Sequence, residues 1–261
     1  MTQAFTSIGV SIAGPVMTVE IQRPPNNFFD IVLIEEIATA CEAADADPAV
    51  RAVVLAAQGK SFCAGADFSR RQAGEGPAPG AKPGRHLYKE AVRLFRVKTP
   101  IVAAVQGAAI GGGLGLACAA DFRVTCAEGR FSANFNRLGF HPGFGLTATL
   151  PRLVGAQQAA LLFYTGRRVP GEEAVRIGLA DQLVPQAELR EAATALATEI
   201  AQSAPLAVRS TRETLRWGLA DAVERATERE LVEQEWLRQT EDFKEGVKAT
   251  AERRLPAFQG R

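Results

Sequence analysis

The sequence has little histidine, little cysteine and no excess of charge, and each shortage excludes a class of function. Its 261 residues include two histidines, and 30 basic side chains are balanced by 29 acidic ones. This balance gives no electrostatic reason to expect a nucleic-acid or membrane partner, although a local basic cluster can still hold a small anion. The four cysteines are Cys41, Cys63, Cys118 and Cys126. Their spacing matches no zinc pattern, so we expect no metal site and four reduced, mostly buried thiols in a cytoplasmic protein.

Long apolar runs are also missing. No stretch of 18 apolar residues occurs, so no membrane span is expected. The opening stretch MTQAFTSIGVSIAG has no basic region before an apolar one, so a secretory signal is not expected either. The chain has no internal repeat, and its 47% apolar content suits an ordinary globular core in one or two domains.

Apolar periodicity predicts an α/β protein. We predict strands at 16–22, 50–57, 101–106 and 122–126, and helices at 31–47, 86–98 and from the glycines near 111 to about residue 120. After residue 150 the pattern is mostly helical, at 156–164, 170–178, 187–203, 206–218 and 221–239. Because strands alternate with helices in the first part, we expect parallel pairing there.

The stretch 72–85, QAGEGPAPGAKPGR, is the one low-complexity segment. Glycine and proline dominate it, which is typical of a surface loop. Our hypothesis is that it closes over a bound substrate as a lid, and the alternative is a tolerated surface insertion.

Two small-residue loops follow two of the buried strands. SFCAGAD follows the strand at 50–57, and GAAIGGG follows the strand at 101–106. Ligands of α/β sheets gather at such strand ends, and two backbone N–H groups aimed at one carbonyl oxygen form an oxyanion hole. The alternative is close packing of a helix on a strand. A GxGxxG dinucleotide fingerprint is excluded, because its last glycine would fall on Leu116 or Cys118.

Six motifs in order resemble one known family. They are VEIQRPPNN (19–27), GKSFCAGAD (59–67), KTPIVAAVQGAAIGGGLGLACAAD (98–121), LPRLVG (150–155), TGRRVPGEEAVRIGLADQLVP (165–185) and EDFKEGVKATAERRLPAF (241–258). Together they span nearly the whole chain, which resembles the crotonase (enoyl-CoA hydratase/isomerase) superfamily.

The resemblance implies a crotonase-like spiral of ββα units. A core at 1–200 would hold an acyl-CoA site, and a helical region at 201–261 would drive assembly into a homotrimer or a dimer of trimers. It also implies that the thioester carbonyl sits between the backbone N–H groups of Ala66 and Gly112, which stabilise an enolate. Coenzyme A enters as part of the substrate, and no cofactor is implied.

The sequence departs from the family at both glutamates that handle water and the α-proton in its hydratases. Their positions fall on Gly115 and Phe135, neither of which can transfer a proton. The aspartate nucleophile of a dehalogenase branch falls on Gly143. The resemblance therefore supports acyl-CoA binding and enolate stabilisation, and not the usual hydration mechanism.

His141 is then the leading candidate for proton transfer, with a turn-bracing role as the alternative. Arg137, beside Asn136, is a candidate for binding a substrate carboxylate, and more often such residues pair within the protein. His86 and Tyr88 could reach an acyl group. Asp67 is expected to cap a helix, Asp121 to cap or pair structurally, and Cys63 and Cys118 to pack.

For coenzyme A, the resemblance implies phosphate contacts from Arg23, Lys60 and Arg253, with solvated surface charge as the alternative. Thr250 stands where the family usually has an aromatic that packs on adenine. Ala64, Asp67, Gly111 and Phe135 complete the expected substrate-binding residues. The predicted function is a lyase or isomerase acting on acyl-CoA thioesters. Decarboxylation, C–C cleavage and a non-catalytic acyl-CoA-binding scaffold remain alternatives.

Overall fold

The computed structural model describes residues 5–67 and 86–261, so the hypothesised lid at 72–85 lies outside the described residues. The main sheet has the order β1-β2-β3-β4-β6-β9. Its strands are β1 (Ile8–Ala13), β2 (Val16–Ile21), β3 (Ala52–Ala57), β4 (Ile101–Val105), β6 (Phe122–Thr125) and β9 (Gln182–Leu183). Only β1 pairs antiparallel within this sheet, with β2, and the other pairs are parallel as predicted.

A second, three-stranded sheet continues from the first. It has the order β5-β7-β8 and contains β5 (Ala108–Ile110), β7 (Arg130–Ser132) and β8 (Val169–Pro170). Strand β5 follows β4 after two residues, so the chain passes directly from the large sheet to the small one. The glycine segment starts directly after β5, at the end of a strand of the smaller sheet.

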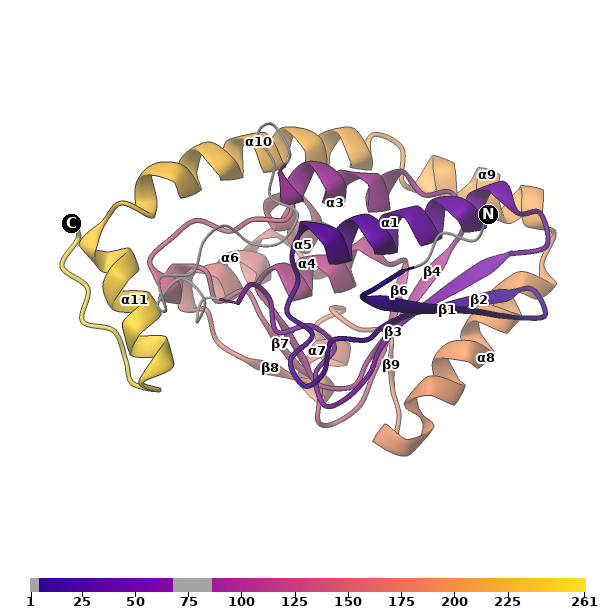
Figure 1. The fold of residues 1–261 in the computed structure, drawn as a ribbon, viewed down its shortest axis with the longest axis horizontal. Helices are drawn as coiled ribbons and strands as arrows, with labels where there is room; N and C mark the ends of the chain where they lie inside the picture. The colour runs from indigo at the N-terminus through magenta and orange to yellow at the C-terminus, as the bar shows by residue number, and fades with distance from the viewer. Residues whose placement is uncertain (1–4, 68–85) are drawn as a thin grey trace.

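Helices cover the large sheet on both faces (Figure 1). They are α1 (Ile31–Ala46), α3 (Leu87–Arg96), α4 (Gly112–Ala119), α5 (Leu146–Val154), α6 (Ala156–Thr165), α7 (Gly171–Arg176), α8 (Leu189–Gln202), α9 (Pro205–Leu215), α10 (Leu219–Leu237) and α11 (Glu241–Ala251), with 3-10 turns η1 (Asn136–Leu138) and η2 (Gln186–Glu188). Every residue of β3 is buried. Val53 and Leu55 face the core beneath α1, and Val54 faces the core beneath α8, which explains the continuous apolar run.

The C-terminal helices wrap around this core. Helix α10 lies along α3, and α11 lies at the opposite end of the molecule from α9 (Figure 1). Helix α11 packs on η1, where a Cβ atom on Gly246 would lie 2.5 Å from the carbonyl carbon of Leu138. The predicted boundary between 1–200 and 201–261 falls inside α8, a helix that packs on the large sheet.

The predicted α/β class is confirmed, and several element boundaries need correction. The helix predicted at 206–218 ends at Leu215, and Gly218 (φ +71°) then forms the N-cap of α10. The helix predicted at 170–178 is the shorter α7, since Val169 and Pro170 pair with β7. Strands β1, β5, β7, β8 and β9 and helix α5 were not predicted. Among the described residues, no helix is both long and apolar enough to span a bilayer.

Candidate active site

The two small-residue loops are joined by hydrogen bonds. The Cys63 N–H donates to the Ala108 carbonyl at 2.8 Å, and the Ile110 N–H donates to the Cys63 carbonyl at 3.0 Å. Cys63 and Ala109 thus form an isolated parallel bridge between the loop after β3 and strand β5. The stretch containing Ala66 is thereby tied to the strand that leads into Gly112.

Close packing explains part of the glycine content, as the alternative interpretation predicted. A Cβ atom on Gly113 would lie 2.0 Å from the Cys63 carbonyl oxygen, and one on Gly112 would lie 2.2 Å from the Phe29 ring. Gly65 has φ +87°, and its Cβ atom would lie 2.7 Å from the Ile110 oxygen. Side chains at these positions would separate the two loops.

The two backbone amides named as an oxyanion hole belong to Ala66 and Gly112. Within residues 5–67 and 86–261, neither the Ala66 N–H nor the Gly112 N–H donates a hydrogen bond to another group. Gly112 is the first residue of α4, where helix N–H groups have no intrahelical acceptor. The preceding Gly111, with φ +56°, instead donates to the Ser132 carbonyl at 2.8 Å. Ala66 is an exposed residue on the loop after β3.

Aromatic rings occupy the space around Gly115 and Phe135, the two positions at which the resemblance implied glutamates. A Cβ atom on Gly115 would lie 2.6 Å from Cδ1 of Phe144, whose ring is fully buried. Phe135 is 5% exposed and packs edge-on against Phe140, with ring centroids 5.4 Å apart. Its ring also faces Gly111, whose Cβ atom would lie 3.6 Å from Cζ. The start of α4 is therefore bordered by apolar surface.

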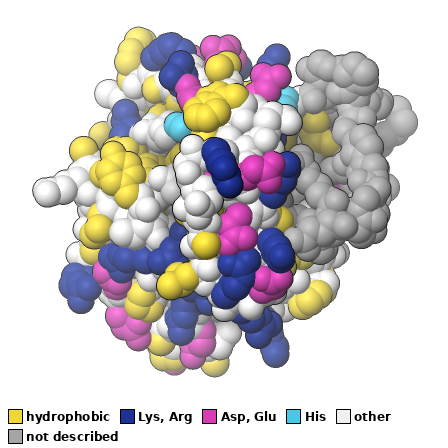
Figure 2. Space-filling model, turned by 90° about the vertical axis from the view of Figure 1, so that its left-hand side faces the viewer, with side chains coloured by type: hydrophobic (Ala, Val, Ile, Leu, Met, Phe, Trp, Pro, Cys, Tyr) yellow, Lys and Arg dark blue, Asp and Glu magenta, His cyan; other side chains and the backbone are white. Residues whose placement is uncertain are grey.

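His141 is half-buried in the segment between η1 and α5. Its Nδ1 lies 2.8 Å from the Pro142 carbonyl oxygen. A carbonyl oxygen only accepts, so this contact is a hydrogen bond when Nδ1 carries the proton. Figure 2 shows both histidines of the chain on one face, close to apolar side chains.

Two side chains of α10 form hydrogen bonds with the backbone of this segment. Gln234 is fully buried and donates to the carbonyl oxygens of His141 at 2.9 Å and Pro142 at 3.2 Å. Glu230 is also fully buried and accepts from the Gly145 N–H at 2.8 Å and the Thr147 hydroxyl at 2.7 Å. Burial raises the pKa of Glu230, although these donors oppose the shift. Sequence reasoning missed both residues, since polar side chains on a charged helix give no signal.

Tyr88 and His86 lie at the N-terminus of helix α3. The Tyr88 hydroxyl contacts the Gln234 amide at 2.9 Å, and burial raises its pKa to about 12. A Cβ atom on Gly143 would lie 1.9 Å from this hydroxyl, so Tyr88 leaves no room for a side chain at residue 143. His86 caps α3 by accepting from the Tyr88 N–H, and burial lowers its pKa.

Two arginines expected to bind the substrate have partners within the protein, namely Arg23 for coenzyme A and Arg137 for a substrate carboxylate. Arg23 forms an ion pair with Asp30 at 2.8 Å. Arg137 donates to the Thr165 carbonyl at 2.7 Å, which directs its guanidinium to the C-terminus of α6. Lys60 and Arg253 are exposed.

The remaining expected residues lie on the loop after β3. Ala64 donates to the Asn26 carbonyl at 2.9 Å, and Asp67 is partly exposed.

The cysteines are free and buried, as predicted. Burial raises the pKa of Cys63 to about 12 and that of Cys118 to about 11, so neither is a nucleophile at neutral pH. Among the residues that the structure describes, no three His, Cys, Asp or Glu side chains gather in a way that could hold a metal ion.

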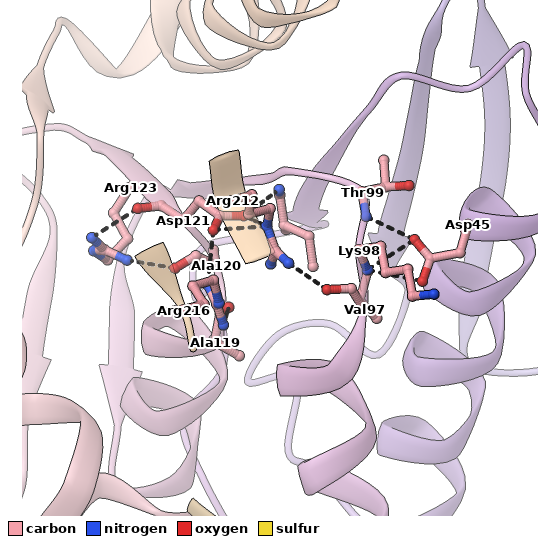
Figure 3. Close-up of polar contacts among 11 residues, drawn as sticks. Asp45, Val97, Lys98, Thr99, Ala119, Ala120, Asp121, Arg123, Arg212 and Arg216 are labelled. Carbon is pink, nitrogen blue, oxygen red and sulfur yellow. Dashed lines mark hydrogen bonds and ion pairs between the residues drawn. The ribbon is translucent and has the colours of Figure 1, made fainter. Parts of the chain in front are cut away.

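Asp121 joins the end of α4 to α9 (Figure 3). Its carboxylate accepts from Arg212 Nε at 2.9 Å, from Arg216 Nη1 at 2.8 Å and from the Ile101 N–H at 2.8 Å. Arg216 also donates to the Ala119 carbonyl at the C-terminus of α4. The structural role expected for Asp121 is confirmed, and the cluster fixes the helix whose first residue is Gly112.

Comparison with known proteins agrees with this geometry. The family model described as "Enoyl-CoA hydratase/isomerase" matches residues 11–261. The chain is 38% identical to a putative enoyl-CoA hydratase of Thermus thermophilus (82% of this chain, 85% of the relative) and 34% identical to carnitinyl-CoA dehydratase of Salmonella typhi (98% and 99%). An enoyl-CoA hydratase/isomerase structure from Pseudoalteromonas atlantica superposes with a TM-score of 0.87 at 29% identity (97% and 100%). The chain belongs to the enoyl-CoA hydratase/isomerase family, within the crotonase superfamily.

Proposed function

We propose that the protein is an enzyme of acyl-CoA thioesters that polarises the thioester carbonyl between the N–H groups of Ala66 and Gly112. The observation that carries the proposal is the hydrogen-bonded pairing of the two loops through Cys63, which ties both amides to one junction. Negative charge grows on the thioester oxygen as an enolate forms. Two fixed donors stabilise that charge more than they stabilise the ground state, by roughly 3–4 kcal/mol per donor.

The substrate class rests on the relatives. Those named above are called a hydratase or a dehydratase of CoA thioesters, and they align with 82–98% of this chain. The exposed Lys60 and Arg253 are proposed to meet coenzyme A phosphates. Arg23 would have to leave its present partner Asp30 to join them, and Arg137 would have to leave the Thr165 carbonyl to bind a substrate carboxylate. Ala64, Asp67, Gly111 and Phe135 are proposed to border the acyl thioester.

The reaction differs from two-glutamate hydration. Gly115 and Phe135 carry no acid, and the neighbouring space holds the rings of Phe144 and Phe140. A substrate that loses carbon dioxide forms its enolate by breaking a C–C bond, so no protein base is needed for that step. The enolate then needs only one proton, which His141 is proposed to donate from Nε2 in its imidazolium form, leaving the neutral ring with its proton on Nδ1. C–C cleavage by water is the alternative, with His141 as the base that activates the water.

The test is incubation with malonyl-type, β-keto and enoyl-CoA esters in deuterated water, with products identified by mass. We expect a product that carries deuterium at the α-carbon. The Ala66→Pro variant removes one N–H donor and should lower turnover by about 100-fold or more. Ala66→Ser keeps the N–H at the same exposed position and is the matched control.

A second candidate is an acyl-CoA-binding protein without turnover. The apolar surroundings of both glutamate positions favour it, because they remove the usual proton-transfer groups. Binding of every ester without any α-proton exchange would support this candidate against the enzyme. No binding of any CoA ester would contradict both.

Assembly is proposed to be a homotrimer or a dimer of trimers through the C-terminal helices. Large apolar side chains are exposed there, with Trp217 81%, Leu215 73% and Trp236 55% accessible in the single chain. Light scattering after size exclusion should give a mass of about three or six chains. A monomer at micromolar concentration would contradict the proposal.

A further inference from the structure

The Pro142 carbonyl oxygen receives two side-chain hydrogen bonds. One comes from Nδ1 of His141 at 2.8 Å, and the other comes from Nε2 of Gln234 at 3.2 Å. Gln234 lies on α10, 92 residues further along the chain, and is completely buried. The group that orients the imidazole is therefore itself oriented by α10.

Both the nitrogen and the oxygen of the Gln234 side-chain amide form hydrogen bonds in this region. Its nitrogen also donates to the His141 carbonyl at 2.9 Å. Its oxygen accepts from Nη2 of Arg238 at 2.6 Å and lies 3.2 Å from the Tyr88 hydroxyl. Such a saturated amide has a single favourable orientation, with the nitrogen toward the two carbonyls.

Glu230 holds the other end of the same segment, one helical turn earlier on α10. It accepts from the N–H groups of Gly145 and Thr147. Phe144 lies between the two attachment points and has φ +65°, a strained value for a residue with a side chain. The segment from His141 to Gly145 is thus held at both ends against its own backbone preference.

We propose that Gln234 is a positioning residue that sets the tautomer of His141. By holding the Pro142 carbonyl against Nδ1, it places the proton of the neutral ring on Nδ1. It leaves Nε2 as the nitrogen that exchanges protons. Free neutral imidazole side chains favour the opposite tautomer, with the proton on Nε2, so the arrangement has a spectroscopic signature of its own. The catalytic part of this inference rests on the proposed function, whereas the tautomer does not.

The test is nitrogen-15 NMR of the imidazole rings in the full-length protein, well above neutral pH. The chain has two histidines, and His86→Gln removes one set of signals and so assigns the other. We expect His141 to carry its proton on Nδ1. In Gln234→Glu, which keeps the acceptor for Arg238 and loses both donors to the carbonyls, the population should shift to Nε2–H. Gln234→Leu is the second variant, in case one of the two fails to fold.

Gln239→Glu makes the same charge change at an exposed position near the end of α10 and should leave the tautomer unchanged. An Nε2–H tautomer in the unmodified protein, or an unaltered Nδ1–H tautomer in both Gln234 variants, would overturn the inference. Turnover should fall about tenfold or more in Gln234→Glu, mainly in kcat. If the unmodified protein turns over no CoA ester, the proposed function fails and the tautomer measurement still decides the role of Gln234.

Discussion

The ring of Phe144 lies directly against the backbone of Gly115. A Cβ atom at residue 115 would approach Cδ1 to 2.6 Å and both Cβ and Cγ to 2.8 Å. Phe144 is fully buried and also packs against the rings of Phe29 at 5.8 Å and Tyr88 at 6.3 Å. The Phe144 ring is therefore enclosed by its neighbours. Any side chain at residue 115 would have to displace it.

Gly115→Ala is therefore expected to destabilise the protein by about 1–3 kcal/mol, because it overpacks a filled core. In a Phe144→Gly background the same substitution should cost nothing or stabilise α4, since alanine is the better helix former. Urea unfolding of the four proteins gives the coupling energy between the two positions. Additive effects of the two changes would mean that the ring does not determine what residue 115 can be.

Gly113→Ala is expected to cost more, about 2–6 kcal/mol. The new Cβ atom would lie 2.0 Å from a backbone oxygen, that of Cys63, which cannot rotate away. Relief requires loss of the two hydrogen bonds that Cys63 forms with Ala108 and Ile110, at about 0.5–1.5 kcal/mol each, in addition to overpacking.

Gly14→Ala is the control for the Gly113 substitution. Its Cβ atom would meet nothing within 4 Å, and it carries only the cost of its left-handed backbone. Both variants are compared by urea unfolding and by coenzyme A ester binding. Equal losses of stability and binding in the two variants would contradict the role assigned to the loop pairing.

Asp121→Asn should destabilise the protein by about 3–5 kcal/mol. The carboxylate is the shared partner of Arg212 and Arg216, whose side chains are 9% and 13% exposed, and its loss leaves two buried cations without a counter-charge. Glu224→Gln breaks the exposed ion pair with Arg96 and should cost less than about 1 kcal/mol. Thermal unfolding of the two variants under the same conditions separates the cases, and similar losses would show that the Asp121 cluster adds no more than a surface pair.

The strongly periodic and continuously apolar elements could be predicted from the sequence. The strand 52–57 is buried on both faces and the helix 31–46 buries one stripe, so each leaves a pattern. Strand β1 was missed because most of its side chains are exposed and it contains glycine and serine. Strands β5 and β7 have three residues each, too few for a period, and α5 contains Pro151.

The candidate site also has features that could be predicted from the sequence and features that could not. The Ala66 and Gly112 loops were found from small residues at strand ends and from the resemblance, both of which are local in sequence. The contact between Tyr88 and Gln234 joins residues 146 positions apart, and no motif beside either residue predicts it. The space around Gly115 also could not be predicted, since Phe144 reaches it from a separate segment with a left-handed backbone. Local motifs in the sequence predicted which loops form the candidate site. The contacts around those loops come from distant segments and determine which chemistry the site can hold.

The four cysteines provide a prediction that depends on pKa. Burial raises the pKa of Cys41 and Cys63 to about 12 and that of Cys118 to about 11, and it raises the pKa of Cys126 as well. A thiol with a raised pKa stays protonated at mildly alkaline pH, and the thiolate is the reactive form. The folded protein should therefore react with a disulfide reagent only as fast as it unfolds, whereas the denatured chain should titrate four thiols at once. A rapid reaction of Cys63 in the folded protein would show that the loop between β3 and the first amide donor opens in solution. Protection of that rapid reaction by a coenzyme A ester would place the opening at the proposed site.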